Sequence, residues 1–379
     1  MKHITIAVVL VIGLTSGCGR SVESSESVTA SSSTNSPATL VGKWITEADG
    51  SVMIDPQTSG LAVWREQLLS ISDGSAHETQ RRRIHVVNPT TAQLQPKPAV
   101  MAMSSRVRRS CFVNYLSGQP DLEALVVDPE NDNVFYTVTE DATRSGALSP
   151  RCQKKYENSG STDYPTVLVR VEQSESGRAT MTHARALKFD TEFGVGNFPN
   201  DGIEGMAITP EKLLYLGLEK DKQGKARIFS VQLNDEFWAT SEFAEVSEPN
   251  LQLPTFLEGN HPINALTRYA PNGQPGVLIA AARNDNEIWI IDEQGNKPAK
   301  RVEFNFAVEI MGNSECGDTE IMDNASIEGI AVIDHTLWLV NDPWKRNYLK
   351  NIQCPDNAEH YNAMAPVLFS TPIPKEWLL

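Results

Sequence analysis

Two stretches of this sequence, Ile203-Glu204-Gly205-Met206-Ala207 and Ile327-Glu328-Gly329-Ile330-Ala331, repeat one pattern and decide the fold. Each is followed, after a short polar turn, by a second apolar run that ends in an acid or amide, at 213–219 and 337–342. Short apolar runs rich in branched and aromatic residues and bounded by turn residues predict β-strands. Each stretch therefore predicts the first strand of an antiparallel hairpin.

Three further copies of the pattern lie along the chain in weaker form. They are Ser59-Gly60-Leu61-Ala62-Val63 with 68–73, Leu122-Glu123-Ala124-Leu125-Val126 with 134–140, and Ile263-Asn264-Ala265-Leu266 with 277–281. Additional strands are expected later in the modules, at 167–171, 226–231 and 287–291. The interval between copies exceeds the ~40–45 residues of a WD40 blade but still suits one four-stranded sheet with long loops.

These repeats, together with weak helical periodicity, predict an all-β fold: a single β-propeller of four-stranded blades. Five modules are visible, and the weakly patterned stretch 90–115 leaves room for a sixth. The segment 43–55 is expected to add an outer strand to the last blade and close the ring.

The N-terminus has the features of an export signal. A short basic start precedes the apolar run 4–14, which is shorter than the ~18 residues of a membrane span. Leu14-Thr15-Ser16-Gly17-Cys18 then resembles a bacterial lipobox, although Thr15 stands where Leu is usual. We expect a lipoprotein signal peptide at 1–17, lipidation of Cys18, and anchoring in the bacterial cell envelope. Gly19 resembles an outer-membrane address if the host is Gram-negative, and an ordinary secreted protein is the alternative.

Composition divides the rest of the chain into a tether and a folded domain. The Ser-rich stretch up to residue 40 can bury little and is expected to be a tether at 18–40, leaving 41–379 as the propeller domain. With 40% hydrophobic and 21% charged residues, the chain has ordinary globular composition. A net charge of −15 repels phosphate backbones, so no nucleic-acid partner is expected.

Cysteine usage agrees with export. Besides Cys18, four cysteines remain, an even number that favours two disulfides in an oxidising compartment. Of the three pairings, we favour Cys111–Cys152 and Cys316–Cys354, because each pair brackets one loop-rich region. Free buried thiols are the alternative, and the absence of a CxxC spacing argues against zinc.

The repeats also carry a family resemblance. The Glu-Gly-Met-Ala at Glu204 and the Glu-Gly-Ile-Ala at Glu328, with the apolar second strands that follow them, resemble the repeats of two propeller families. One is the phytase-like family named for "esterase-like activity of phytase", and the other is the SdiA-regulated family. This resemblance implies a propeller and, for the first family, calcium-dependent hydrolysis of esters or phosphoesters. A fold hosts many functions, so it does not fix the chemistry.

Equivalent positions in a propeller converge on its axis, because the first strand of each blade lines the central channel. Here these positions hold Ser59, Glu123, Glu204, Asn264 and Glu328. Carboxylates that share a narrow channel repel one another and require raised pKa values or a cation. Ca²⁺ fits, since it takes oxygen ligands from carboxylates and amides, and lactonase-like propellers hold an axial calcium with a similar set. We expect Ca²⁺ on Glu123, Glu204, Asn264 and Glu328; the alternative is that each Glu bonds backbone N–H groups of the next blade.

A second ring is expected where the second strands end. It comprises Asp73, Glu140, Glu219, Asn284, Asn341 and Asp342, which are also ordinary turn residues. Lys220, Arg283 and Lys345 lie nearby in sequence and would make this face a mixed-charge pocket.

Basic groups also cluster on this acidic chain. Arg81-Arg82-Arg83 and the group Arg106, Arg108 and Arg109 suit phosphate or lipopolysaccharide, or are simply solvated strand faces.

Two classes of function remain open. The favoured one is a lipid-anchored envelope propeller that binds calcium in its channel and acts as a binding or scaffold module for an envelope protein or small anionic ligand. The alternative is a calcium-dependent phytase-like phosphoesterase or esterase. The sequence contains no GxSxG, HExxH or P-loop motif, so it assigns no catalytic residue.

Overall fold

The computed structural model describes residues 36–96, 100–140, 142, 146–196, 198, 200–234, 236–271, 274–312 and 315–378. The expected signal peptide, Cys18 and nearly all of the tether lie outside these residues. The first strand, β1 (Ala38–Trp44), begins before the expected domain start at residue 41. Alternate residues of β1 are buried from Leu40 on, as expected for a strand with one buried face. The Ser-rich composition just before β1 makes this period of two hard to recognise in the sequence.

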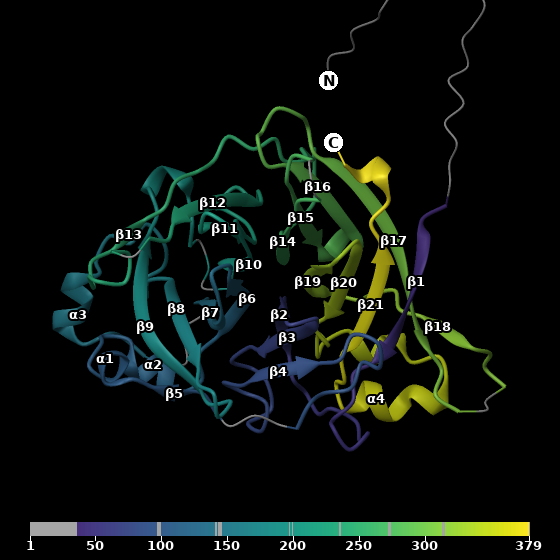
Figure 1. Cartoon of the computed structure of the whole chain (residues 1–379). Helices are drawn as coiled ribbons and strands as arrows, with labels where there is room; N and C mark the ends of the chain where they lie inside the picture. The colour runs from purple at the N-terminus through teal and green to yellow at the C-terminus, as the bar shows by residue number, and fades with distance from the viewer. Residues whose placement is uncertain are drawn as a thin grey trace, which may run out of the picture. The chain divides into compact units, whose positions relative to one another are not determined.

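The described residues fold mostly into strands, with few and short helices. The strands form five groups, sheets I to V, each beginning on one of the predicted hairpins (Figure 1). Sheet I contains β2 (Thr58–Trp64), β3 (Gln67–Ser72) and β4 (Ile84–Val87). Sheet II contains β6 (Leu122–Asp128), β7 (Asn131–Thr139), β8 (Val167–Gln173) and β9 (Ala179–Lys188), with the short β5 (Ala102–Met103) and β13 (Ala244–Glu245) at its edge.

The remaining sheets follow the same antiparallel order. Sheet III contains β10 (Ile203–Ile208), β11 (Leu213–Leu218) and β12 (Arg227–Gln232). Sheet IV contains β14 (Ala265–Tyr269), β15 (Val277–Ala282), β16 (Glu287–Asp292), β17 (Lys300–Glu309) and the side strand β18 (Thr319–Ile321). Sheet V contains β19 (Ile327–Ile333), β20 (Thr336–Asn341), β21 (Val367–Pro372) and β1.

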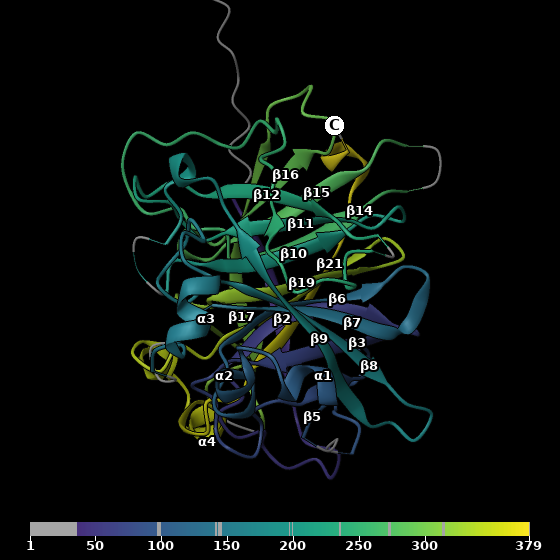
Figure 2. The ribbon, with the colours of Figure 1, turned by 90° about the vertical axis from the view of Figure 1, so that its left-hand side faces the viewer.

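Helices occupy the connections. The α-helices are α1 (Ser105–Arg108), α2 (Val113–Ser117), α3 (Pro150–Lys155) and α4 (Ala358–Asn362). The 3-10 turns are η2 (Thr191–Phe193), η3 (Arg283–Asp285), η4 (Tyr348–Asn351), η5 (Pro355–Asn357) and η6 (Lys375–Trp377). Figure 2 shows α1, α2 and α3 on the outer side of sheet II. The described residues of the stretch 90–115 include β5, α1 and part of α2.

The five inner strands pack against one another in a closed cycle, in the order β2, β6, β10, β14, β19 and back to β2. Five hydrophobic clusters fill the gaps between successive sheets, so that each sheet has a core on both faces. This arrangement is propeller-like, as the repeats predict. The hydrophobic effect stabilises this arrangement by burying both faces of every sheet. The middle strands are therefore nearly continuous apolar runs in the sequence.

The Glu-Gly repeat has a steric cause at its glycine. A Cβ on Gly205 would lie 2.8 Å from the carbonyl carbon of Ala265 and 2.8 Å from the backbone nitrogen of Leu266, in the neighbouring inner strand. A Cβ on Gly329 would lie 2.9 Å from the carbonyl carbon of Gly60. The inner strands therefore approach too closely at this point for any side chain, and only glycine fits.

The ring closes through β1, as expected, although with residues 38–44 instead of 43–55. This strand pairs antiparallel with β21 and parallel with β17, which joins sheets IV and V into one nine-stranded sheet. Both expected disulfides, Cys111–Cys152 and Cys316–Cys354, are present.

Replacing Trp44 by Ala is expected to cost about 3–5 kcal/mol of stability, because it empties the site where β1 meets the last helix. Trp44 is 3% exposed, stacks on His360 at a ring-centroid distance of 4.8 Å and meets Tyr361 edge-on at 4.9 Å. The measurement is urea unfolding. Val41→Ala in the same strand, at a side chain that is 46% exposed, is the control and should change stability by less than about 0.5 kcal/mol. Equal effects of the two substitutions would contradict the role of β1 in closing the ring.

Candidate functional site

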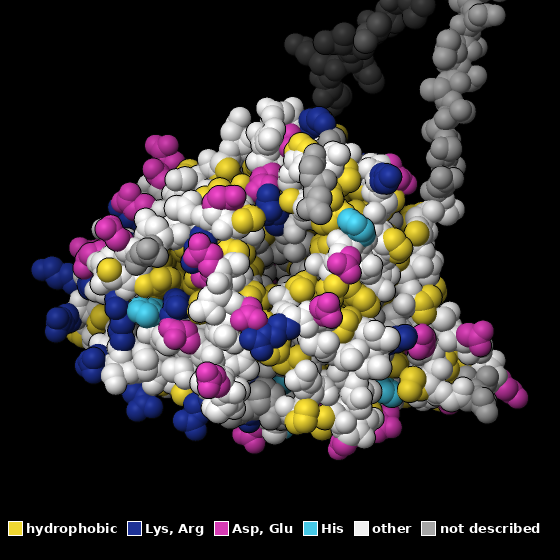
Figure 3. All heavy atoms as spheres, in the orientation of Figure 1, with side chains coloured by type: hydrophobic (Ala, Val, Ile, Leu, Met, Phe, Trp, Pro, Cys, Tyr) yellow, Lys and Arg dark blue, Asp and Glu magenta, His cyan; other side chains and the backbone are white. Residues whose placement is uncertain are grey.

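The carboxylates of the two rings expected from the sequence lie in one region near the ring axis. In an antiparallel hairpin the start of the first strand lies beside the end of the second, as the pairings Leu122↔Thr139 and Ile203↔Leu218 show. Glu123 therefore lies close to the end of β7, and Glu204 lies close to Glu219 after β11. Figure 3 shows a hollow near the middle of this face, bordered by acidic and basic side chains.

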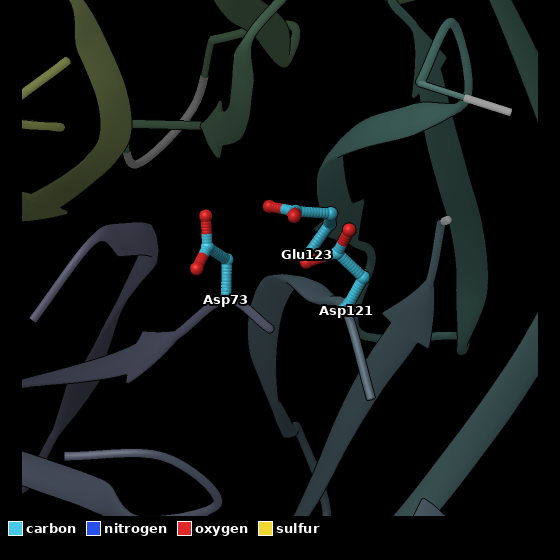
Figure 4. Close-up of side chains that lie close together, drawn as sticks. All are labelled: Asp73, Asp121 and Glu123. Atoms are coloured by element: carbon cyan, nitrogen blue, oxygen red, sulfur yellow. The ribbon is translucent and has the colours of Figure 1, made fainter. Parts of the chain in front are cut away.

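Asp73, Asp121 and Glu123 form the first acidic cluster (Figure 4). Asp73 follows β3 in sheet I, Asp121 directly precedes β6 in sheet II, and Glu123 lies within β6. One carboxylate oxygen from each lies within 4.8 Å of the other two. Figure 4 shows the Asp73 and Glu123 carboxylates facing the space between them, with Asp121 beside Glu123.

Backbone amides fix two of these carboxylates in place. Asp121 Oδ1 accepts a hydrogen bond from the backbone N–H of Gly74 at 2.7 Å, which joins sheets I and II. Asp73 Oδ1 accepts from the backbone N–H groups of Ser75 and Ala76. The cluster is thus built into the junction of two sheets and needs no rearrangement to present its oxygens.

The electrostatics of this cluster are unfavourable for three charged groups. Burial raises the pKa of Glu123 well above its usual range, and the carboxylates of Glu204, Asp121 and Asp73 raise it further. Burial also raises the pKa of Asp73 well above its usual range, with Asp121 and Asp342 adding to the effect. The charged groups that act most strongly on both residues are carboxylates, so the cluster has a surplus of negative charge.

Glu140, Glu204 and Glu219 form the second cluster, again with one oxygen from each within 4.8 Å of the others. All three are buried. Burial raises the pKa of each, and the neighbouring carboxylates of Glu140 and Glu219 raise the pKa of Glu204 further. Glu140 Oε1 also accepts from the backbone N–H of Gly202 in the next sheet at 2.7 Å.

Three basic side chains form ion pairs with carboxylates in and around the second cluster. Arg283, in the turn after β15, forms an ion pair with Glu328 and lies 3.5 Å from Glu219. Lys220 pairs with Asp201 at 3.0 Å and lies 3.6 Å from Glu219. In addition, Lys345 pairs with Asp55 at 3.0 Å. The second cluster therefore has nearby cations.

Asp342 lies near Asp73 of the first cluster and also near the basic side chains Arg283 and Lys345. Its burial raises its pKa to about 7, while Arg283 and Lys345 oppose the increase and Asp55 adds to it. A buried carboxyl that titrates near neutral pH is a common feature of functional sites.

Several buried polar atoms in this region have no hydrogen-bond partner among the described residues. Asn264 is fully buried, and both its Oδ1 and its Nδ2 lack a partner. The same holds for Glu219 Oε2 and Asp342 Oδ1. Leaving such atoms unpaired costs about 1–3 kcal/mol each, so each is a candidate contact for a bound ion, water or ligand.

The four expected calcium ligands have different surroundings. The structure buries Glu123 and Glu204 in separate, adjacent clusters, pairs Glu328 with Arg283, and leaves Asn264 without a partner among the described residues. Carboxylate bonds to the N–H groups of a neighbouring sheet do occur, but Asp121 and Glu140 make them.

One residue of the expected second ring lies apart, and one residue of the site escaped sequence analysis. Asn284 is exposed and donates to the Asn260 carbonyl at 3.0 Å. Asp121 was missed, although it stands two residues before Glu123, and alternate residues of a strand share a face.

No helix in the described ranges is long and apolar enough to cross a bilayer. No known family model matches the chain, and no curated protein sequence matches it either.

Several solved structures show a distant likeness. The allergen Mala s 1 of Malassezia sympodialis is 11% identical over 84% of this chain and 94% of its own, with a TM-score of 0.44. A putative glucose dehydrogenase of Thermus thermophilus is 12% identical over 88% of this chain and 100% of its own, with a TM-score of 0.39. Virginiamycin B lyase of Staphylococcus aureus is 12% identical over 85% and 87%, with a TM-score of 0.31. None of these likenesses assigns a function.

Proposed function

We propose that this protein is a lipid-anchored, five-bladed envelope propeller that binds Ca²⁺ near its axis and acts as a binding or scaffold module. The first acidic cluster, Asp73, Asp121 and Glu123, is the proposed centre of the calcium site. The tether from Cys18 would hold the propeller at the membrane, where an envelope protein or small anionic ligand is its expected partner.

The observation that carries the calcium proposal is the surplus of negative charge in this cluster, in which Glu123 is buried and Asp73 and Asp121 are half-buried. Burying an ionised carboxylate without a counter-charge is costly, so the group either takes up a proton or binds a cation. Arg283 and Lys220 act on the second cluster, whereas carboxylates dominate the surroundings of Asp73 and Glu123. A divalent cation bound to these oxygens would keep the first cluster ionised at neutral pH.

The donor set favours Ca²⁺ over other metals. Ca²⁺ takes 6–8 oxygen ligands at about 2.3–2.6 Å in flexible geometry, whereas zinc prefers nitrogen and sulfur. Asp73, Asp121 and Glu123 supply carboxylate oxygens only. Asn264, whose carbonyl oxygen has no partner among the described residues, is a further oxygen donor in the same axial region.

Thermal unfolding of the protein with calcium and with chelator tests this function. Calcium at about 100-fold over its dissociation constant should add roughly 2.7 kcal/mol of stability, a midpoint increase of about 4 °C. Glu123→Gln should abolish that increase. It should also make the metal-free protein more stable than the metal-free wild type at pH 7, because it removes a buried charge.

The exposed Glu309 at the end of β17 offers a matched control. Glu309→Gln removes the same charge at a position outside both acidic clusters. This control should keep the full calcium effect. A calcium effect that persists in Glu123→Gln, or no calcium effect on the wild type, would disprove the proposed site.

A calcium-dependent phosphoesterase or esterase of the phytase-like kind is the second candidate. The buried Asp342 favours it, because a carboxyl with a pKa of about 7 beside Arg283 and Lys345 suits general acid–base catalysis. Turnover of p-nitrophenyl phosphate or p-nitrophenyl butyrate that requires calcium would establish it. The binding function predicts no turnover of either compound, with or without calcium.

A further inference from the structure

A second polar site lies away from the axis, in a groove between sheets II and III. The groove has a volume of about 390 Å³, within the range of about 300–1,000 Å³ that is usual for small-molecule sites. Its lining includes basic, aromatic and histidine side chains: Arg106, Tyr136, Arg170, His183, Lys212 and Trp238. Figure 3 shows basic side chains and a histidine gathered at the side where α1, α2 and α3 lie in Figure 1.

Sheet II supplies one wall of the groove as a row of cross-strand neighbours. Tyr136 on β7 pairs with Arg170 on β8, and Arg170 pairs with His183 on β9. Directly opposed residues of neighbouring strands share a face, so the register fixes all three on the side of the sheet that faces the groove. The row therefore exists before any ligand binds.

Trp238, in the connection after β12, supplies the other wall. Its ring is nearly parallel to that of Tyr136, at an interplanar angle of 7° and a centroid distance of 5.9 Å, and lies 5.6 Å from that of His183. Arg185 holds this connection in place by donating to the carbonyl oxygens of Phe237, Glu242 and Phe243. The half-buried Trp238 thus presents a fixed aromatic surface to the groove.

The groove brings three basic groups, Arg106, Arg170 and Lys212, together on a protein of net charge −15. Arg106 donates to the Trp238 carbonyl, and Arg170 pairs with Glu172, whose side chain is 45% exposed. Burial lowers the pKa of His183 most, and the guanidinium groups of Arg106 and Arg170 lower it further. Positive charge is therefore the stronger influence on the His183 side chain.

Among the described residues of the lining, the acidic group is Asp128, and it is already occupied. Asp128 accepts a hydrogen bond from the Tyr136 hydroxyl and lies 3.3 Å from the Lys212 ammonium, so it does not compete for a ligand's polar groups. Lys212 also pairs with Glu130, which is 70% exposed and free to turn into solvent.

We propose that this groove binds a small anionic sugar, with its phosphate or carboxylate on Arg106, Arg170 and Lys212 and its ring against Trp238. Guanidinium groups bind such anions through charge-assisted hydrogen bonds, and the indole offers an apolar face for a sugar ring. The neutral His183 is placed to hydrogen-bond a sugar hydroxyl. This proposal rests on residues outside the axial calcium site and stands independently of it.

Calorimetric titration of the whole protein with glucose 6-phosphate, glucuronate, glucose and inorganic phosphate tests the proposal. At least one of the two anionic sugars should bind saturably with a dissociation constant below about 1 mM, and added salt should weaken it. Uncharged glucose should bind far more weakly. Inorganic phosphate should bind more weakly than glucose 6-phosphate, since it lacks the ring that contacts Trp238.

Variants locate the binding. Arg106→Gln should weaken the bound sugar about tenfold, the effect of losing one charge-assisted hydrogen bond, while the exposed Arg109→Gln at the end of the same helix should not. Trp238→Ala should reduce the affinity for glucose 6-phosphate to that for phosphate, and Glu123→Gln should have no effect. Absence of saturable binding by both anionic sugars, or equal losses in Arg106→Gln and Arg109→Gln, would overturn the proposal.

Discussion

Raising the pH from 4 to 7 without metal is expected to lower the free energy of unfolding of this protein by several kcal/mol. The cause is a set of buried or half-buried carboxyls near the ring axis, whose pKa values are raised in the folded state. They are Asp73, Glu123, Glu140, Glu204, Glu219 and Asp342.

The sign follows from where the protons are. Between an ordinary carboxyl pKa of about 4 and the raised value, the folded protein holds protons that the unfolded chain has lost, so stability falls as pH rises. For Asp342, a pKa of 3.8 in the unfolded chain and about 7 in the folded protein correspond to a loss of roughly 4 kcal/mol above pH 7.

Urea unfolding at a series of pH values measures this effect. Asp342→Asn should make the fall in stability between pH 4 and 7 smaller, whereas Asp334→Asn in an exposed turn should leave it unchanged. Calcium should restore the stability lost at pH 7 and have little effect at pH 4, where protons occupy the carboxyls. A metal-free protein whose stability increases steadily from pH 4 to 7 would contradict this account of the axial carboxyls.

Replacing Gly205 by Val is expected to destabilise the protein by about 3 kcal/mol or more, or to prevent folding. The first atom of any side chain there would lie 2.8 Å from the backbone of β14, and neither inner strand can move without disturbing the cores on both sides. The measurement is thermal unfolding, with expression of soluble protein as a preliminary readout.

Gly50→Val is the matched control. A Cβ at Gly50 would have nothing within 4 Å, so only its positive φ of 84° opposes the substitution. That strain is worth roughly 1–2 kcal/mol, clearly less than the collision at Gly205. Similar losses at the two positions would show that the inner strands do not require glycine where they meet.

Much of the fold could be predicted because the repeat records a local steric requirement. The Glu-Gly pattern at Gly205 and Gly329 marks the closest approach of the inner strands, and the apolar run after each marks a strand buried on both faces. The disulfides could be paired because each links cysteines about 40 residues apart around one loop-rich region. The start of β1 could not be found, because two exposed residues separate the Ser-rich stretch from its first buried side chain, Leu40.

The candidate site was harder to predict, because its geometry depends on contacts between sheets. Equivalent positions in the repeats pointed to Glu123 and Glu204 as neighbours, but not to their separation into two clusters. That separation depends on Asp121 and Glu140, which bind the N–H groups of adjacent sheets, and on Arg283, which reaches Glu328 from another sheet. Such partners are distant in sequence, and no repeat pattern records them.

The groove between sheets II and III shows the same limit. Arg106 was recognised as part of a basic cluster, but Arg170 and His183 lie singly in their strands. Only the strand register brings these two beside Tyr136, and only the connection after β12 covers them with Trp238.

A crystal structure of the protein grown with calcium, with an anomalous difference map, tests the central claim most directly. The account predicts a calcium peak bound by one oxygen each from Asp73, Asp121 and Glu123, at distances of about 2.3–2.6 Å. A map without a peak at these carboxylates, with the three side chains instead hydrogen-bonded to one another through shared protons, would contradict it.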